Sequence, residues 1–423
     1  ERALALLDAG ARADALPATD DRDQRRLPIL AAVLPDLRLL RTLIAHGVSL
    51  DADASGITPL LAATRDSWHG RPDAVAMLLA NGADVRATDP QGNTPLHHAA
   101  RSTDPGVAAL LLDAQAQIDI ANDNGQTPLA MACAAGNWRL AKFLLERGAS
   151  VAPANALAPL LAAATADDDD PAGVQLLLRH RAQVADAVDG DGRTALHLAA
   201  QAGHSAIVQT LLDSGASVDV RDATQTTPLM LAAQGGHREV IDALLESKAD
   251  VAARNADGHD ALRHAVEGEV AGADVIAALQ AAGAHVDVID DAGVDALARA
   301  KALGRWSVVQ ALDPAFVPPP VAGSDSDVAA DDAAPNRPPY AVVSDALRDG
   351  DSATLERFAP LLERSEFTRM LAELAPSSPQ LVPWLLARGA DVDASREGHS
   401  LLGQLLRLAP GDANAAQALD LLW

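Results

Sequence analysis

The sequence contains a single cysteine, Cys133, so no disulfide can form within the chain. A lone thiol is typical of a protein from a reducing compartment. No run of about 18 apolar residues is free of charges and helix breakers, so we expect no membrane-spanning helix. The chain begins at Glu1, without a methionine or a signal-like segment.

Aromatic residues make up only 2% of the chain, although hydrophobic residues make up 49%. The apolar surface therefore comes from alanine, leucine and valine, which suit closely stacked helices better than a β-sandwich or barrel. With 423 residues the chain exceeds the ~250–300 residues at which single cores stop growing. We expect several domains or an elongated repeat array.

Basic residues are few, since 33 lysines and arginines stand against 58 acidic residues, for a net charge of −25. Such a chain repels nucleic-acid phosphates and anionic membranes, so neither is expected as a partner. The charge favours a protein partner with a basic surface, although solubility alone would also explain it. Lysine occurs only at Lys142, Lys248 and Lys301, beside abundant alanine, which is typical of a GC-rich bacterial genome. We expect a bacterial, cytoplasmic protein, with secretion into a host cell as the alternative.

Two sequence strings recur along the chain. The distance from Thr94 to Thr127, and again from Thr194 to Thr227, is 33 residues. The first string occupies Gly92–Ala100, Gly125–Cys133, Gly192–Ala200 and Thr226–Ala233, opens at Gly56–Leu60, and is degraded at Gly258–Leu262 and Gly293–Leu297. The second follows it at Leu78–Val85, Leu144–Val151, Leu211–Val218 and Leu385–Val392.

The residues of each copy predict a turn and two helices. Asp or Asn stands three residues before glycine, and such a side chain can bond its own backbone while glycine supplies the positive φ. We call this turn the tip. Threonine then suits the N-cap of a first helix and proline its first position. A second helix ends at a glycine suited to the left-handed C′ position. The tips begin at Asp53, Asp89, Asn122, Asp189, Asn255 and Asp290, and the C′ glycines are Gly82, Gly148, Gly215, Gly283 and Gly389.

The linked strings resemble the ankyrin repeat, which has a period of 33 residues and a T-P-L-H-x-A signature. The resemblance implies an all-α fold, an α-solenoid of stacked helix-turn-helix repeats with β-turn tips. It also implies that His97 and His197, at the T-P-L-H position, bridge neighbouring repeats through hydrogen bonds. His204 and His237, in the Gly-His pairs between the two helices, are expected to be structural as well.

The repeats predict three parts of the chain. Residues 1–312 form an ankyrin-type array with a partial first unit and an eroded last unit. Residues 313–339, rich in proline and aspartate, form a flexible linker that serves either as a spacer or as a recognition motif. Residues 340–423 form a second, truncated array. Because both ends lack polar capping repeats, we expect the sequence to be part of a longer protein.

No group of residues predicts an enzyme, a metal site or a cofactor site. Cys133 is expected to be a buried, inert thiol. The acid run 167–170 lacks the alternating ligand spacing of a calcium loop, and is interpreted as a solvated loop or a docking spot for a basic partner. An insertion lies at 68–72, because Thr58 to Thr94 is 36 residues. Its Trp68 either anchors a partner or packs on the helices beneath.

The predicted partner-binding surface follows from the resemblance, since ankyrin-type binders use the tips and the first helices. Neighbouring repeats differ at these positions while matching elsewhere, as a recognition surface would, although drift would look the same. The tip positions are Asn93, Asp123, Asn124, Gln126, Asp191, Arg193, Thr224, Thr226, Asp257 and His259, and the first-helix positions are Arg65, Asp66, Arg101, Gln201 and Gln234.

We therefore predict a monomeric protein-interaction scaffold that binds a protein partner on the concave face of the solenoid. The alternative is the targeting or regulatory arm of a larger bacterial enzyme or secreted effector, whose active part lies outside these 423 residues. An enzyme within the chain is not expected.

Overall fold

The computed structural model describes residues 2–12, 26–53, 55–65, 71–102, 104–183, 187–270, 272–318, 337–392, 395–396, 399–408 and 413–422. Contacts divide the chain into two units. Unit 1 comprises Glu1–Ala232 and Glu239–Asp250, and unit 2 comprises Ala233–Arg238 and Val251–Trp423. Among these residues, no helix combines the length and the apolar character needed to cross a membrane.

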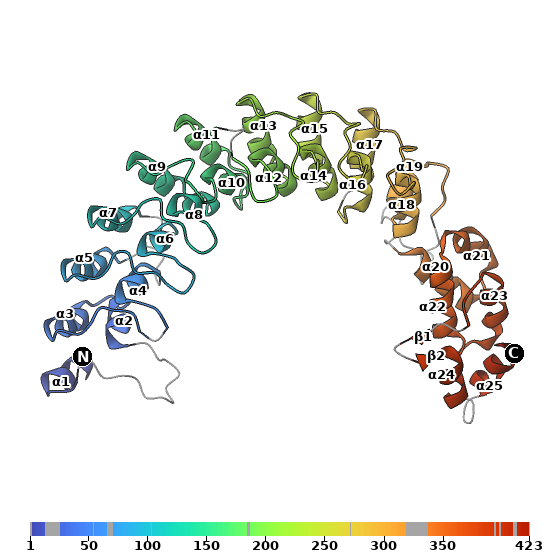
Figure 1. Cartoon of the computed structure of the whole chain (residues 1–423), viewed down its shortest axis with the longest axis horizontal. Coiled ribbons are helices and arrows are strands. Elements are labelled where there is room, and N and C mark those ends of the chain that lie inside the picture. The colour runs from blue at the N-terminus through green and yellow to red at the C-terminus, as the bar shows by residue number, and fades with distance from the viewer. Residues whose placement is uncertain are drawn as a thin grey trace, which may run out of the picture. The chain divides into compact units, whose positions relative to one another are not determined.

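Unit 1 is a row of helix pairs in two layers, in which first helices pack on first helices and second helices on second helices (Figure 1). α1 (Arg2–Asp8) packs on the first of the second helices. The first helices are α2 (Leu27–Ala32), α4 (Pro59–Arg65), α6 (Pro95–Ala99), α8 (Pro128–Ala134), α10 (Pro159–Ala164), α12 (Ala195–Ala202) and α14 (Pro228–Gly235), whose end belongs to unit 2. The second helices are α3 (Arg38–Ala45), α5 (Pro72–Ala80), α7 (Gly106–Asp113), α9 (Trp138–Glu146), α11 (Ala172–Arg179), α13 (Ser205–Asp213) and α15 (Arg238–Glu246).

Unit 2 contains two helix pairs of its own, α16 (Ala261–Glu267) with α17 (Ala273–Ala281) and α18 (Ala296–Leu303) with α19 (Trp306–Leu312). The remaining elements are α20 (Pro339–Asp349), α21 (Ser352–Phe358), η1 (Ala359–Leu361), α22 (Arg364–Leu374), η2 (Pro379–Leu381), α23 (Val382–Ala387), β1 (Ser395–Arg396), β2 (His399–Ser400), α24 (Leu401–Leu408) and α25 (Ala413–Leu422). β1 and β2 form one short antiparallel pair. The predicted all-α solenoid is confirmed. The eroded last repeat is a prediction that falls on α18 and α19.

An aromatic cluster joins both sides of the predicted linker within unit 2. Trp306, fully buried, stacks on Phe316 with ring centroids 5.7 Å apart, and meets Phe358 edge-on at 5.2 Å. Arg357 donates to the carbonyl of Val317, and Arg337 pairs with Asp345. The helices before and after residues 313–339 thus pack in one unit. The acidic run 324–327 lies outside the described residues, and a spacer role for it stays a prediction.

The tips have the predicted hydrogen bonds. In the tip after Thr88, one carboxylate oxygen of Asp89 accepts from the amides of Gln91 and Asn93 at 2.9 and 2.8 Å, and Gly92 has φ +74°. The same arrangement recurs at the other predicted tips. Asp222 begins a further tip, which has no glycine. Gln225 stands at the glycine position there and adopts the left-handed conformation with φ +63°.

The predicted caps are also present. Thr127 Oγ1 accepts from the amide of Ala130 at 3.2 Å, with Pro128 at the first helical position. At the equivalent place before α10, Ala158 offers no side-chain cap. Replacing Ala158 by threonine is expected to raise the free energy of unfolding by about 1 kcal/mol, and Thr127→Ala to lower it by a similar amount. Urea denaturation checks both, and equal stability of all three proteins would contradict this account of capping.

The signature histidines bridge neighbouring repeats as predicted. His97 Nδ1 accepts from the amide of Thr94 at 3.1 Å, so its proton is on Nε2, which donates to the carbonyl of Gln126 at 3.0 Å. His197 makes the same bonds to Thr194 and to the carbonyl of Thr226. His204 Nδ1 lies 3.2 Å from the carbonyl of Ala164, which confirms its structural role.

Burial lowers the pKa of His97, His98 and His197. Near and below the unfolded-state pKa of about 6.5, these histidines are therefore protonated in the unfolded chain but remain neutral in the folded chain. We expect the free energy of unfolding to decrease from about pH 7.5 to about pH 5.5, by at most about 1.4 kcal/mol per pH unit for each histidine. Urea denaturation at several pH values measures this slope. The variant H97N/H197N should have a shallower slope, and an unchanged slope would exclude these histidines as its source.

Candidate interaction surface

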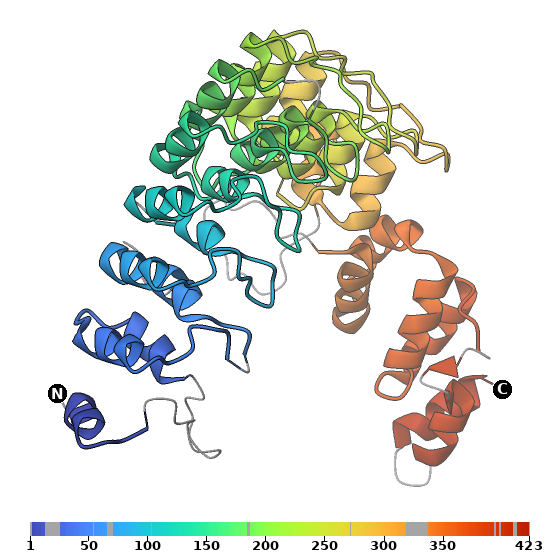
Figure 2. The same ribbon diagram turned by 60° about the vertical axis from the view of Figure 1, so that its left-hand side comes forward.

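Neighbouring tips are joined by backbone hydrogen bonds. In unit 1 the amide of Asp123 donates to the carbonyl of Gln91 at 3.1 Å, and the amide of Ala223 to that of Asp191 at 2.9 Å. In unit 2 the amide of Asp291 donates to the carbonyl of Asp257 at 3.4 Å. The tips at Asn122, Asp222 and Asp290 are thus held both by their own Asx side chains and by the preceding tip. The tips project from the ends of the first helices (Figure 2).

Most predicted surface residues reach solvent. The exposed ones are Arg65, Arg101, Asp123, Asn124, Asp191, Gln201, Thr224, Gln234 and Asp257, and the half-buried ones are Asn93, Gln126, Arg193 and His259. Thr226 differs, because its side chain is only 5% exposed and lies against Thr224 Oγ1 at 2.9 Å. It lies beneath its tip and offers a partner little surface. Asp66 and Trp68 lie outside the described residues.

Several half-buried residues already bond within the chain. Arg193 Nε donates to Asp189 at 2.9 Å and its Nη2 lies 3.2 Å from Asp191. Asn93 Oδ1 accepts from the side-chain amide of Asn122 at 2.8 Å. Substitutions at Arg193 or Asn93 would thus disturb the tips themselves. Sequence position alone does not separate such residues from those available to a partner.

Several exposed polar side chains are at the tip apices. Asp123 and Asn124 in unit 1 and Asp257 in unit 2 are exposed. Gln225, which is not among the predicted surface residues, is exposed as well. The sequence could have indicated this exposed position, because Gln225 occupies the place of the tip glycine in the other tips.

An ionic cluster in unit 2 was also missed. Arg263 takes the position of the signature histidine and is buried, with Nη2 2.9 Å from Asp290 and Nε 3.1 Å from Glu267. Its Nη1 donates to the carbonyl of Asp295 at 3.2 Å, so arginine replaces histidine as the bridge to the next repeat. His259 lies 3.6 Å from Asp290 and 3.8 Å from Glu267, which assigns it to the cluster as well as to the surface.

The acid run has two structural members, contrary to its interpretation as a simple solvated loop. Asp169 accepts from the amides of Ala206 and Ile207 at 2.8 and 3.0 Å, and so caps α13 from the preceding repeat. Asp170 accepts from Trp138 Nε1 at 2.7 Å and from the amide of Ala172 at 3.0 Å. Within the run, only Asp167 and Asp168 are exposed without such a function.

The cysteine and the possible metal ligands are candidate chemical groups among the described residues. Cys133 is fully buried, and burial raises the pKa of its thiol to about 12, which makes it a poor nucleophile. Among the described residues, no group of three or more His, Cys, Asp or Glu side chains is arranged to hold a metal ion.

Comparisons with known proteins agree with this architecture. A family model described as ankyrin repeats (3 copies) matches residues 67–155, 151–222 and 216–290. Protein PhlB of Serratia liquefaciens is 40% identical over 99 residues, which are 23% of this chain and 40% of that protein. The match thus spans two fifths of the length of this bacterial relative.

Two solved structures are similar to the chain. The human ASB11 ankyrin repeat domain is 29% identical, with a TM-score of 0.48, over 54% of this chain and 99% of that domain. The ankyrin repeat domain of Bcl-3 is 30% identical, with a TM-score of 0.44, over 53% of this chain and 100% of that domain.

Proposed function

Because the chain belongs to the ankyrin repeat family, whose repeats are generally protein-interaction modules, we propose that it is a scaffold that binds a protein partner across its tips and first helices. The observation that supports this most is the set of exposed, varied side chains on the tips, several of which are joined to their neighbours by backbone hydrogen bonds. Such a preorganised surface loses little conformational entropy on binding.

The proposed partner presents a basic surface. The chain has a net charge of −25, and Asp123, Asp191 and Asp257 are exposed at the tips. Opposite charges across an interface increase the association rate and exclude wrong partners. We propose that the chain acts as a monomer in the bacterial cytoplasm. A polar interface of modest affinity is expected, since the tips contain few aromatic residues.

Affinity capture with matched variants tests the proposal. The variant N124K/Q225K adds two lysines at exposed tip positions, whereas Q175K/Q209K adds two lysines on the second helices α11 and α13. The wild type and the second-helix variant are expected to capture the same basic protein, and the tip variant at least about tenfold less of it, because like charges repel across an interface. Equal capture by all three proteins would contradict binding at the tips.

A further inference from the structure

The tip at residues 153–157 departs from the others in sequence. The distance from Thr127 to Ala158 is 31 residues and from Ala158 to Thr194 is 36 residues, so the period of 33 is lost on both sides. Counted back from the first helix, Pro153 stands where the other tips have Asp or Asn. Ala156 stands where most have glycine. Proline has neither the amide nor the side-chain acceptor that closes a regular tip.

The backbone of this tip changes accordingly. The left-handed conformation moves to Asn155, which has φ +58°. The tip still bonds to the preceding one, since the amide of Leu157 donates to the carbonyl of Gly125 at 2.7 Å. Among the described residues, however, no backbone hydrogen bond joins 152–158 to 187–193. The 153–157 tip therefore bonds to the tip before it, but this bonding is interrupted between it and the tip at 189–193.

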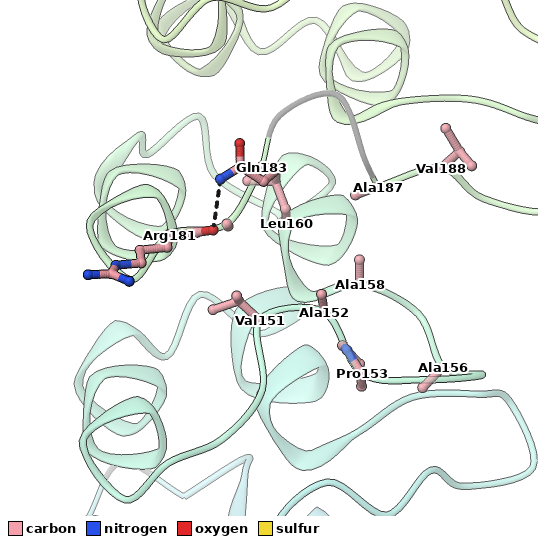
Figure 3. A pocket seen from close by; sticks show the side chains of 11 residues that line it. Val151, Ala152, Pro153, Ala156, Ala158, Leu160, Arg181, Gln183, Ala187 and Val188 are labelled. Carbon is pink, nitrogen blue, oxygen red and sulfur yellow. Dashed lines mark hydrogen bonds between the residues drawn. The ribbon is translucent and has the colours of Figure 1, made fainter.

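A hollow of about 210 Å³ lies in the interruption (Figure 3). Nine of its eleven lining residues have apolar side chains, among them Val151, Pro153, Leu160 and Val188, and the other two are Arg181 and Gln183. Val188 is 53% exposed, so its side chain is open to solvent. The hollow is smaller than the ~300–1,000 Å³ of pockets for whole small-molecule ligands, so its size suits a single side chain.

We propose that this hollow takes one aliphatic side chain from an extended segment of the partner protein, with basic residues on either side of it. This proposal rests on the function proposed above. The aliphatic lining selects the anchor, because a leucine buried there leaves water. The two tip edges are not bonded to each other, unlike those at Gln91–Asp123 and Asp191–Ala223, and they face a gap that an extended backbone can enter. Exposed Asp123 and Asp191 stand on the tips on either side and favour flanking lysine or arginine.

Methyl-labelled NMR of the full chain tests the anchor with two synthetic probes. The peptides acetyl-Lys-Ala-Leu-Ala-Lys-amide and acetyl-Lys-Ala-Ala-Ala-Lys-amide differ only at the central side chain. The leucine peptide is expected to shift the methyl signals of Val151, Leu160 and Val188, with an affinity about tenfold or more above that of the alanine peptide. Equal affinities of the two peptides, or shifts elsewhere only, would overturn the proposal.

A matched pair of variants tests whether the leucine peptide binds in the hollow. Ala158→Leu fills the hollow, whereas Ala154→Leu adds the same side chain on the exposed part of the same tip, outside the hollow. The first should abolish the shifts by the leucine peptide and the second should leave them unchanged. If Ala158→Leu does not fold, the comparison of the two peptides on the wild type still decides.

The outcomes separate this proposal from the proposed function. If Ala158→Leu captures the partner as well as the wild type while N124K/Q225K does not, the tips bind the partner but the hollow is not its anchor. If the leucine peptide binds the hollow while all variants capture proteins equally, the hollow is a peptide site and binding across the tips is wrong.

Discussion

Replacing Arg305 by methionine is expected to lower the free energy of opening around α16 by about 3–5 kcal/mol. Arg305 is 7% exposed, and its Nη1 donates to the carbonyls of Ala265 and Val266 at 2.9 and 2.8 Å and to that of Gly268. These carbonyls end α16 and have no partner within the helix. A buried cation at a helix C-terminus also interacts favourably with the helix dipole. Methionine fills the space but leaves the carbonyls without a donor.

Hydrogen exchange is the appropriate measurement, because a repeat array need not unfold in one step. Amides of α16 to α19 should exchange at least about a hundredfold faster in Arg305→Met, since every 1.4 kcal/mol is a factor of about ten. The control is Arg139→Met at an exposed position of α9, which should change stability by less than about 0.5 kcal/mol. If the α16 amides of Arg305→Met exchanged as slowly as those of the wild type, the Arg305 guanidinium would not be needed to stabilise the end of α16.

Replacing Gly268 by alanine is expected to destabilise the same region by about 3 kcal/mol, at the upper end of the range for overpacked sites. A Cβ at this position would lie 2.7 Å from the carbonyl carbon of Gln234 and closer still to its carbonyl oxygen. Both are backbone atoms, so the end of α14 would have to move. Gly268 has φ −67°, which any residue adopts, so the cost is steric rather than conformational.

Gly190→Ala provides the matched control, because a Cβ there meets nothing within 4 Å and its φ lies outside the left-handed region. Thermal denaturation and hydrogen exchange should distinguish the two alanine variants clearly. If Gly268→Ala were as stable as Gly190→Ala, the close approach of α14 to residue 268 would not exist in solution.

The fold could be predicted because the structure of each repeat is determined mainly by interactions between residues that are close in the sequence. An Asx side chain, a glycine, a threonine cap and a proline act on close neighbours in the chain, so their functions follow from the sequence alone. The C′ glycines confirm this, since Gly82, Gly148, Gly215 and Gly389 all have positive φ.

The functions of individual polar residues could not be predicted, because they depend on the neighbouring repeat. Asp169 looks like part of a solvated run, yet it caps a helix of the following repeat. Arg305 lies in the place of the histidine of a Gly-His pair, and its carbonyl partners are visible only once repeats stack. Arg193 and His259 are predicted partner contacts that also have neighbours within the chain, since Arg193 donates to Asp189 and His259 lies 3.6 Å from Asp290.

The candidate interaction surface could be predicted in part from the sequence. Exposure of the tips follows from the repeat pattern, and most of the predicted residues are indeed exposed. The interruption at Pro153 was readable in the spacing of 31 and 36 residues. The hollow could not be read from the sequence, because it depends on how the displaced tip lies against Val188 of the next repeat.

If the tips and first helices form the partner-binding surface, a bound partner must protect their amides. Hydrogen exchange of the chain alone and in complex with its captured partner measures this. Protection is expected at the tips and first helices, with the second helices α9, α11 and α13 unchanged. Protection confined to the second helices would contradict binding at this surface.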